Sequence, residues 1–368
     1  MKRGMTLGKI LFVYNSVSFQ EKARNLVLGE CASSVTVGSV YEALIKTGSE
    51  VIPLNLSNPG QLEQAAAARQ ADMAFVIAEG FLDTPQTFYD GSGAMMIREI
   101  LNGRGIPYTH SSPETMKILR NKDCTHRTLA AAGIKVPSFQ VIDSGMDLEA
   151  RGAEIEENMA YPLFVKPAGG GCSICIDKHS VVHNRRELVE RVRMVQRMLR
   201  NQPVLVETYL PGREYTVCVL GNHERYVLPV IGFASDAGVR SAAVKGALQY
   251  GGLEVELLPE MHPVTLSLTS LGATVFEVLG TQDIIRLDVK EDDQGICHVI
   301  DVNGTPSVAA AGSVMTMAAA AGIQQHEMIA LVLYEALVRE NIAIPSSLVE
   351  MVAEPLGKLQ LLKSHKVA

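Results

Sequence analysis

Two short stretches, residues 284–290 and 297–303, constrain the fold most, because each alternates apolar and polar side chains and turn-forming residues separate them. This pattern predicts the two strands of a β-hairpin. Alternate side chains of a strand point to the same face of a sheet. Asp288, Asp301 and Asn303 therefore share one face of the predicted hairpin, where three oxygen ligands converge.

The chemistry of this face favours a metal site. Mg²⁺ binds oxygen ligands, takes few protein carboxylates and fills its other positions with water and substrate phosphates. Arg286, just before Asp288, joins the same face as a cation that can grip phosphate. For any single aspartate, an exposed hairpin with merely solvated acids is the alternative interpretation. Because two carboxylates, an amide and an arginine coincide, we predict a site for Mg²⁺, with Mn²⁺ as the alternative ion.

The composition excludes several classes of protein. At 368 residues the chain is long enough for two or three domains, and 47% hydrophobic residues are ample for buried cores. The 33 basic and 40 acidic residues give a net charge of −7, so no broad cationic surface serves nucleic acid or an anionic membrane. No apolar run approaches the roughly 20 residues of a membrane span. We therefore expect a cytoplasmic protein with no nucleic-acid and no membrane partner.

The first third of the chain alternates predicted strands and helices. Strands are expected at residues 9–16, 50–56 and 73–78, and helices at 35–47 and 94–101. This alternation predicts a parallel sheet with helices on both faces, which defines the α/β class of fold, while the paired strands farther along add α+β character. We place an N-terminal α/β domain at residues 1–112.

A glycine-rich loop follows a buried strand that ends in Lys166. The loop residues are Gly169, Gly170, Gly171, Cys172 and Ser173. Successive glycines let backbone N–H groups turn toward one point, which forms a concavity for phosphate oxygens. A flexible hairpin tip is the alternative interpretation of the glycines alone. The lysine placed shortly before them favours the phosphate site.

The C-terminal part carries further candidate residues. Glu207 and Glu214 stand at the ends of two predicted strands, where a carboxylate can receive an amine or a pair of hydroxyls, although either is alternatively an ordinary surface acid. Lys245 lies in a Gly- and Ala-rich segment without periodicity. Residues 307–322 are small enough to let a ligand approach the backbone closely. We expect the tail, residues 346–368, to be a partly ordered appendage.

In order and content these parts resemble the ATP-grasp superfamily, and more closely the D-alanine–D-alanine ligases. The resemblance runs from Lys9 to about Arg339 and rests on residues 105–112, 121–137, 163–167, 206–214, 286–288 and 301–306. It implies a three-domain ATP-grasp architecture, in which two ATP-grasp subdomains follow the N-terminal parallel α/β domain. We place these subdomains at residues 113–203, with the Gly-rich loop, and at 204–345, with the metal face.

The resemblance also implies a role for each candidate residue. The residues expected to bind ATP are Lys122, Lys166, Gly171, Cys172, Ser173, Glu207, Leu210, Glu214 and Lys245. Among these, Glu207 belongs at the adenine edge and Glu214 at the ribose hydroxyls. The residues expected in catalysis are Arg286, Lys245, Ser173 and Glu30, and those expected to hold two Mg²⁺ are Asp288, Asp301 and Asn303. The residues expected to border the substrates are Gly304, Ser307, Gly312 and Ser313.

The chain departs from the family pattern mainly around the amino-acid pockets. Glu79-Gly80 and residues 90–93 stand in place of the family's His-Gly and Gly-Glu-Asp-Gly element, and the family has other residues at Cys172, Cys175, Gly246 and Gly312. Glu30 lies near a family glutamate without perfect register, and Asp301 is a shorter carboxylate than the usual glutamate. These differences leave the ATP chemistry in place and the amino-acid specificity open.

We therefore expect an ATP-dependent carboxylate–amine ligase that forms a dipeptide or a related amide through an acyl phosphate. Its substrates are small molecules, either amino acids or a similar acid and amine. Two alternatives stay open: a specialised amino-acid ligase of secondary metabolism, and a catalytically inactive ATP-binding regulatory protein. The resemblance also favours a homodimer formed through the N-terminal domain.

Overall fold

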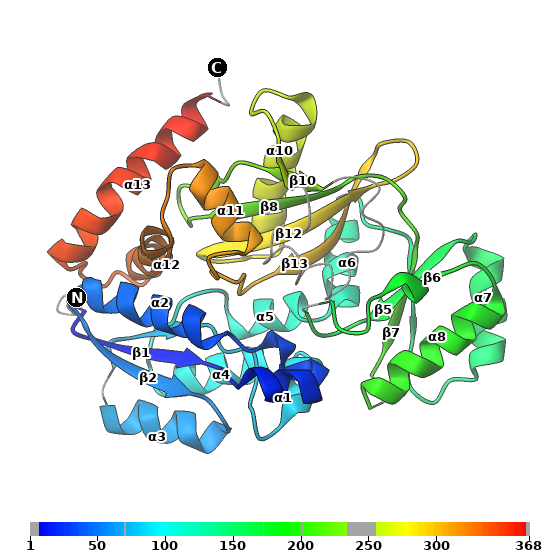
Figure 1. The fold of residues 1–368 in the computed structure, drawn as a ribbon, viewed down its shortest axis with the longest axis horizontal. Helices are drawn as coiled ribbons and strands as arrows, with labels where there is room; N and C mark the ends of the chain where they lie inside the picture. The colour runs from blue at the N-terminus through cyan, green and yellow to red at the C-terminus, as the bar shows by residue number, and fades with distance from the viewer. Residues whose placement is uncertain (1–6, 70, 172, 201, 234–254, 366–368) are drawn as a thin grey trace.

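The computed structural model describes residues 7–69, 71–171, 173–200, 202–233 and 255–365 of the chain. Within these residues the strands form three sheets, one parallel and two antiparallel. Figure 1 shows the parallel sheet beneath the largest antiparallel sheet, while the remaining sheet projects to one side with its own pair of helices. This mixed α/β architecture confirms the fold class expected from the sequence.

The N-terminal part is built around a parallel sheet of order β2-β1-β3. Its elements are β1 (Lys9–Tyr14), α1 (Phe19–Arg24), η1 (Leu26–Glu30), α2 (Ser34–Lys46), β2 (Glu50–Asn55), α3 (Pro59–Arg69), β3 (Met73–Val76), η2 (Pro85–Phe88) and α4 (Ser92–Gly103). Ile10 and Phe12 of β1 enter the core that contains α2, whereas Leu11 and Val13 enter the core of α3 and α4. Helices therefore cover both faces of this sheet, as the alternating pattern predicted.

The central part is an antiparallel sheet of order β4-β7-β5-β6, covered by two helices. Its elements are β4 (Phe139–Ile142), α7 (Leu148–Asn158), β5 (Leu163–Pro167), η3 (Lys178–Ser180), β6 (Val181–Val182), α8 (Arg185–Met198) and β7 (Val204–Thr208). Because β7 pairs with β4 on one side and β5 on the other, this sheet extends past residue 203, the limit expected for the central subdomain.

The C-terminal sheet has the order β11-β10-β8-β12-β13, with β9 beside β8. Its elements are β8 (Glu214–Leu220), β9 (Tyr226–Val227), β10 (Ile231–Phe233), β11 (Val255–Leu257), α10 (Pro263–Val278), β12 (Ile284–Glu291), β13 (Cys297–Asn303) and α11 (Ser313–Ala320). The strands β12 and β13 form the predicted hairpin. Helices α5 (Pro113–Leu119) and α6 (Lys122–Ala131) connect the N-terminal part to the central one, and their apolar side chains enter the core of the C-terminal sheet.

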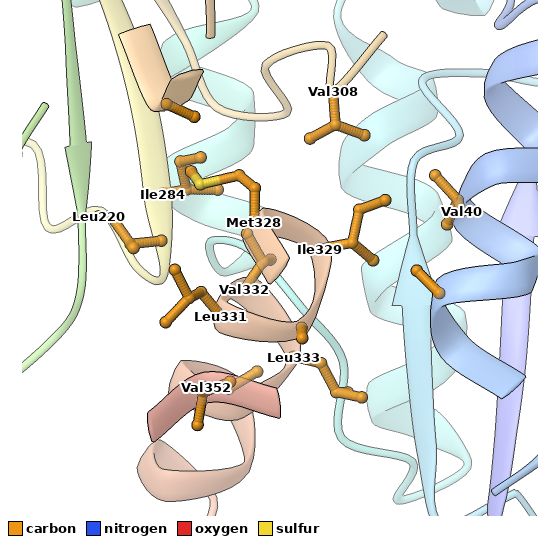
Figure 2. Close-up of a cluster of buried hydrophobic side chains, with 14 of the residues drawn as sticks. Val40, Leu220, Ile284, Val308, Met328, Ile329, Leu331, Val332, Leu333 and Val352 are labelled. Atoms are coloured by element: carbon orange, nitrogen blue, oxygen red, sulfur yellow. The ribbon is translucent and has the colours of Figure 1, made fainter. Parts of the chain in front are cut away.

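Helix α12 (Gln325–Arg339) joins the N-terminal and C-terminal parts through apolar contacts. Figure 2 shows Ile329 on the side that faces Val40 of α2, and Leu331 on the side that faces Leu220 of β8. Val352 of the last helix packs below them. The helix is buried on most sides, so its apolar residues stabilise the contact between two parts of the molecule.

The prediction of a partly ordered tail is wrong for residues 346–365. These residues form α13 (Ser346–His365), a helix of 20 residues. Leu348, Val352 and Leu359 are 0%, 1% and 1% exposed and join the core that contains α12. They recur at helical spacing, so one face of the segment is apolar despite its lysines, and burial of this face stabilises the helix.

Asp283, which is 0% exposed, joins elements that are distant in sequence. Its carboxylate lies 3.0 Å from the guanidinium of Arg339 and accepts a hydrogen bond of 2.7 Å from the backbone N–H of His110. The side-chain amide of Asn222 donates to the same carboxylate and to that of Glu335. Burial of Glu335, together with the negative charge of the nearby Asp283, raises the pKa of Glu335 to about 7.

Replacing Glu335 with glutamine should stabilise the protein more at alkaline pH than at acidic pH. The folded-state pKa of about 7 exceeds the ordinary 4.5, so ionised Glu335 destabilises the folded state and stability falls as the pH rises through this interval. The glutamine keeps an acceptor for Asn222 without the charge. The thermal unfolding midpoint should exceed that of the unsubstituted protein by roughly 2–4 °C near pH 8 and by less near pH 5. An equal difference in unfolding midpoint at pH 5 and pH 8 would contradict the raised pKa of Glu335.

Candidate active site

A cleft with about 880 Å³ of empty space, part of which is open to solvent, lies between the central and C-terminal sheets. Nine of the predicted site residues line it: Lys122, Lys166, Gly171, Ser173, Glu207, Leu210, Glu214, Asp288 and Asp301. The tertiary structure thus brings most of the predicted ATP residues and both predicted metal carboxylates to one place.

The β12–β13 hairpin supplies one wall of the site. Asp288 pairs with Asp301 across the two strands, and Arg286 pairs with Asn303. The hydroxyl of Thr216, on β8, donates to Asp288 at 2.8 Å, and the Arg286 guanidinium lies 3.1 Å from the same carboxylate. The predicted acidic face therefore exists, and a neighbouring strand orients its more buried aspartate.

The donor set of the hairpin fits a hard divalent cation. Asp288 and Asp301 offer two carboxylates, of which Asp301 has a side chain that is 30% exposed toward the cleft. Asn303 adds an amide oxygen, which also accepts a hydrogen bond of 3.0 Å from the N–H of Thr305. Two carboxylates and an amide leave coordination positions for water and phosphate oxygens, which is the arrangement that Mg²⁺ prefers.

Two lysines from different elements meet opposite this wall. Lys166, at the end of β5, places its ammonium 2.9 Å from Glu207 and donates to the backbone oxygen of Ile300 at 2.9 Å. Lys122, the first residue of α6, donates to the backbone oxygen of Gly170 and lies 3.8 Å from Asp301. Burial lowers the pKa of Lys122, and Asp301 opposes that effect.

Glu207 is 3% exposed and its carboxylate is already engaged. Besides Lys166, it contacts the ring of His126 at 2.7 Å. Burial disfavours its ionised form, but the charges of Lys166 and the contact with His126 outweigh burial and hold the pKa of Glu207 below the ordinary value. Sequence reasoning missed His126, and the only available signal was its position one helical turn after Lys122 on α6.

The glycine-rich loop lies against the N-terminal part. A side chain on Gly169 would overlap the backbone oxygen of Tyr89, which follows η2. Gly170 adopts the left-handed φ of 79°, and Ser173 adopts a φ of 54°. The N–H of Gly171 donates to the carboxylate of Glu30. Close backbone packing therefore explains the glycines, and it brings the predicted residue Glu30 to the edge of the cleft.

Two buried side chains near Glu30 were not predicted to belong to the site. Arg120 lies 3.2 Å from Glu30 and 3.1 Å from Glu79. In the sequence, Glu79 stands out only as a departure from the family pattern. Arg120 shows no distinguishing pattern in the sequence, because both of its partners come from other elements.

The predicted substrate residues lie in the loop and helix after the hairpin, beyond the residues that line the cleft. Gly304 packs so closely that a side chain there would lie 2.5 Å from Leu119. Ser307 caps the local turn by accepting from an N–H at 3.3 Å. Gly312 and Ser313 begin α11. Two further predicted site residues, Cys172 and Lys245, lie outside the described residues.

Comparison with known proteins shows the family of this chain. A family model described as "D-ala D-ala ligase C-terminus" matches residues 128–334, which is more than half of the chain. The chain belongs to the D-alanine–D-alanine ligase family. The D-alanine–D-alanine ligase of Ectopseudomonas mendocina is 28% identical over 305 residues, covering 81% of this chain and 88% of that protein. The one from Carboxydothermus hydrogenoformans is 25% identical over 303 residues, covering 81% and 91%.

The fold matches solved structures of the same family. The crystal structure of D-alanine–D-alanine ligase from Bacillus anthracis complexed with ATP superposes with a TM-score of 0.67 at 20% identity and covers 91% of this chain and 98% of that one. The protein from Coxiella burnetii gives a TM-score of 0.64 at 14% identity, covering 92% and 95%. The protein is an ATP-grasp carboxylate–amine ligase of this family. In the part of the chain that the structure describes, no helix is long and apolar enough to cross a membrane.

Replacing Gly169 with alanine should lower ATP turnover by roughly 10²-fold, because the new methyl group would push the loop away from Tyr89 and out of position. Gly38→Ala in α2 is a matched control, since a side chain at Gly38 meets nothing within 4 Å. ADP release and thermal unfolding measured on both variants separate a displaced loop from general destabilisation. Equal turnover in the two variants would contradict this account of the loop.

Proposed function

We propose that this ligase joins two amino acids, or a related acid and amine, and that it requires Mg²⁺. The observation that carries the proposal is the arrangement of one cleft, with Asp288 and Asp301 on one wall and Lys122 and Lys166 opposite. Phosphoryl transfer depends on positioning and charge neutralisation more than on covalent chemistry by the protein. This cleft supplies both through residues from four elements, β5, α6, β12 and β13.

The proposed reaction has two steps. An oxygen of the substrate carboxylate bonds to the γ-phosphorus of ATP. The bond between this phosphorus and the β,γ-bridging oxygen breaks, so that ADP leaves and an acyl phosphate forms. The uncharged amine then attacks the acyl carbon, phosphate leaves, and the nitrogen loses a proton to give the amide. Lys122, Lys166 and Arg286 neutralise the phosphate oxygens, and Lys245 has the same proposed role. The loop at Gly171 keeps water from the acyl phosphate.

The remaining residues position metal, nucleotide and substrates. Asp288, Asp301 and Asn303 hold Mg²⁺, or Mn²⁺ in its place, and the metal charge assists phosphoryl transfer when bound. The hydroxyl of Thr216 fixes the orientation of Asp288. We propose that the nucleotide contacts are completed by Glu207, Leu210, Glu214, Cys172 and Ser173, and that Glu30, Gly304, Ser307, Gly312 and Ser313 border the substrates.

D-alanine is the first substrate to test, because the relatives named above are D-alanine–D-alanine ligases. Purified protein with ATP, Mg²⁺ and a panel of D- and L-amino acids should release ADP and form a new amide, detected by mass spectrometry. D-alanine alone distinguishes a cell-wall type of ligase from a specialised one that needs a mixed pair. ATP binding without turnover for every pair would overturn the proposal in favour of a regulatory nucleotide-binding protein. The need for ATP places the proposed reaction in the cytoplasm.

Asp301→Asn should lower ADP release by about 10²–10³-fold, because the asparagine keeps the shape of the side chain and removes a charge from the metal. Asp293→Asn is a matched control in the exposed turn of the same hairpin and should keep full activity. The dependence of rate on Mg²⁺ concentration and the thermal unfolding midpoint complete the comparison. Turnover of the first variant near the unsubstituted rate would refute the metal assignment.

We also propose a homodimer formed through the N-terminal part. Four large apolar side chains in the described residues of this part are exposed in the single chain: Phe19 by 86%, Leu26 by 58%, Val35 by 75% and Ile45 by 46%. Exposed apolar side chains gathered on consecutive elements are typical of a contact surface.

Phe19→Asp should weaken the dimer at least tenfold, because it introduces a charge into the proposed apolar contact. Leu361→Asp is the control, since Leu361 is 61% exposed on α13 at the other end of the chain. Light scattering across a dilution series measures the mass of each variant. A monomeric unsubstituted protein, or equal dissociation of both variants, would disprove this arrangement.

A further inference from the structure

Arg120 is the centre of a buried group of charges at the edge of the cleft. Its guanidinium lies between the carboxylates of Glu79 and Glu30, at 3.1 Å and 3.2 Å, and all three side chains are at most 8% exposed. It also donates to the backbone oxygen of Phe88. Arg120 stands between α5 and α6, so it joins this junction to three segments of the N-terminal part.

The Glu30 side of this group contacts the glycine-rich loop. The N–H of Gly171 donates to Glu30, and a side chain on Gly171 would lie 2.7 Å from the nearer carboxylate oxygen. The loop backbone therefore rests directly on the carboxylate that Arg120 holds. Since Gly171 lines the nucleotide cleft, a shift of Glu30 moves a part of the cleft wall.

The Glu79 side of the group contacts the chain that follows the metal hairpin. Burial raises the pKa of Glu79, and the Thr305 hydroxyl is one of the groups that act against this effect. Arg98, which is 0% exposed, donates to the same hydroxyl at 3.4 Å. The backbone N–H of Glu79 donates to the side-chain oxygen of Asn15 at 3.0 Å, and its carbonyl packs closely against Gly93. Arg120 thus connects the loop on one side of the site with the hairpin exit on the other.

The charges of this group balance. Arg98 and Arg120 face Glu30 and Glu79, with Lys122 also near Glu30 and Asp283 near Arg98. Burial raises the pKa of Glu79, and the two arginines act in the opposite direction. Removal of the Arg120 guanidinium would leave two buried carboxylates without their shared cation, and like charges at short range repel.

We propose that Arg120 is a positioning residue of the ligase reaction, which orients Glu30 to hold the glycine-rich loop at the cleft and, through Glu79, couples the loop to Thr305. The proposal rests on the function proposed above. An arginine suits this role because its planar fork contacts two carboxylates at once, whereas a lysine offers a point charge that holds one of them well.

The test compares Arg120→Met, Arg120→Lys and the double variant Arg120→Met/Glu79→Gln. The kcat of the methionine variant should fall by about 10²-fold. Its KM for ATP should change by less than about threefold, because the part of the cleft farther from the glycine-rich loop is unaltered. The kcat of the lysine variant should lie between that of the methionine variant and that of the unsubstituted protein. The double variant should recover at least roughly tenfold of the loss, because it removes one of the two repelling charges.

Two further readouts distinguish positioning from general support of the fold. The residual activity of Arg120→Met should fall more steeply with rising pH than that of the unsubstituted protein, because Glu79, whose pKa burial raises, loses the cation that opposes burial. Hydrogen exchange of the backbone amides in residues 168–174 should accelerate in this variant. Arg186→Met is the control, because its arginine side chain is 87% exposed. It should change neither the pH dependence of activity nor the hydrogen exchange of the loop.

The outcomes are separable from those of the proposed function. Reduced kcat with recovery in the double variant and faster loop exchange supports the role of Arg120. A kcat within about threefold of the unsubstituted value, or a loss without recovery and with an unchanged pH profile, overturns it. If the unsubstituted protein forms no amide with any pair, the proposed function fails, and the hydrogen exchange of the loop still decides whether Arg120 positions it.

Discussion

The antiparallel pairing of β12 with β13 is the constraint on which the site depends. Its register places Asp288 opposite Asp301 and Arg286 opposite Asn303. A slip by one residue would turn every side chain of a strand to the other face of the sheet. The pairing of β12 with β8 on its other edge fixes the register and brings Thr216 to Asp288. The cations from the central part can then meet an acidic face whose geometry is set by backbone hydrogen bonds.

Each of the buried lysines at the cleft has an acidic partner, because a buried charge without a partner is costly. The two pairs differ in strength. Glu207 is 3% exposed in its side chain and lies 2.9 Å from Lys166, whereas Asp301 is 30% exposed and lies 3.8 Å from Lys122. A phosphate group can therefore replace the partner of Lys122 more easily than that of Lys166. The Glu207 pair keeps Lys166 in place, and the looser pair leaves room for metal and phosphate.

The three parts of the molecule are joined by contacts of different kinds. Apolar packing around α12 holds the N-terminal and C-terminal parts together, and Asp283 adds a buried polar contact among them. The central part meets the N-terminal part through the glycine-rich loop and Glu30. Apolar packing is insensitive to orientation, whereas the ionic contact demands specific geometry. The more demanding contact lies beside the cleft, where positioning matters most.

The sequence by itself determined the elements that depend on local periodicity: the β12–β13 hairpin, the parallel N-terminal sheet, and Lys166 ahead of its glycines. It failed for α13, whose lysines obscured a buried apolar face. Only the tertiary structure decided the partners of the buried charges. Arg120 and Glu30 are 90 positions apart, and His126 and Glu207 are 81 apart. Alternation and helical spacing report on neighbours within one element, whereas charge pairing between elements depends on how those elements pack.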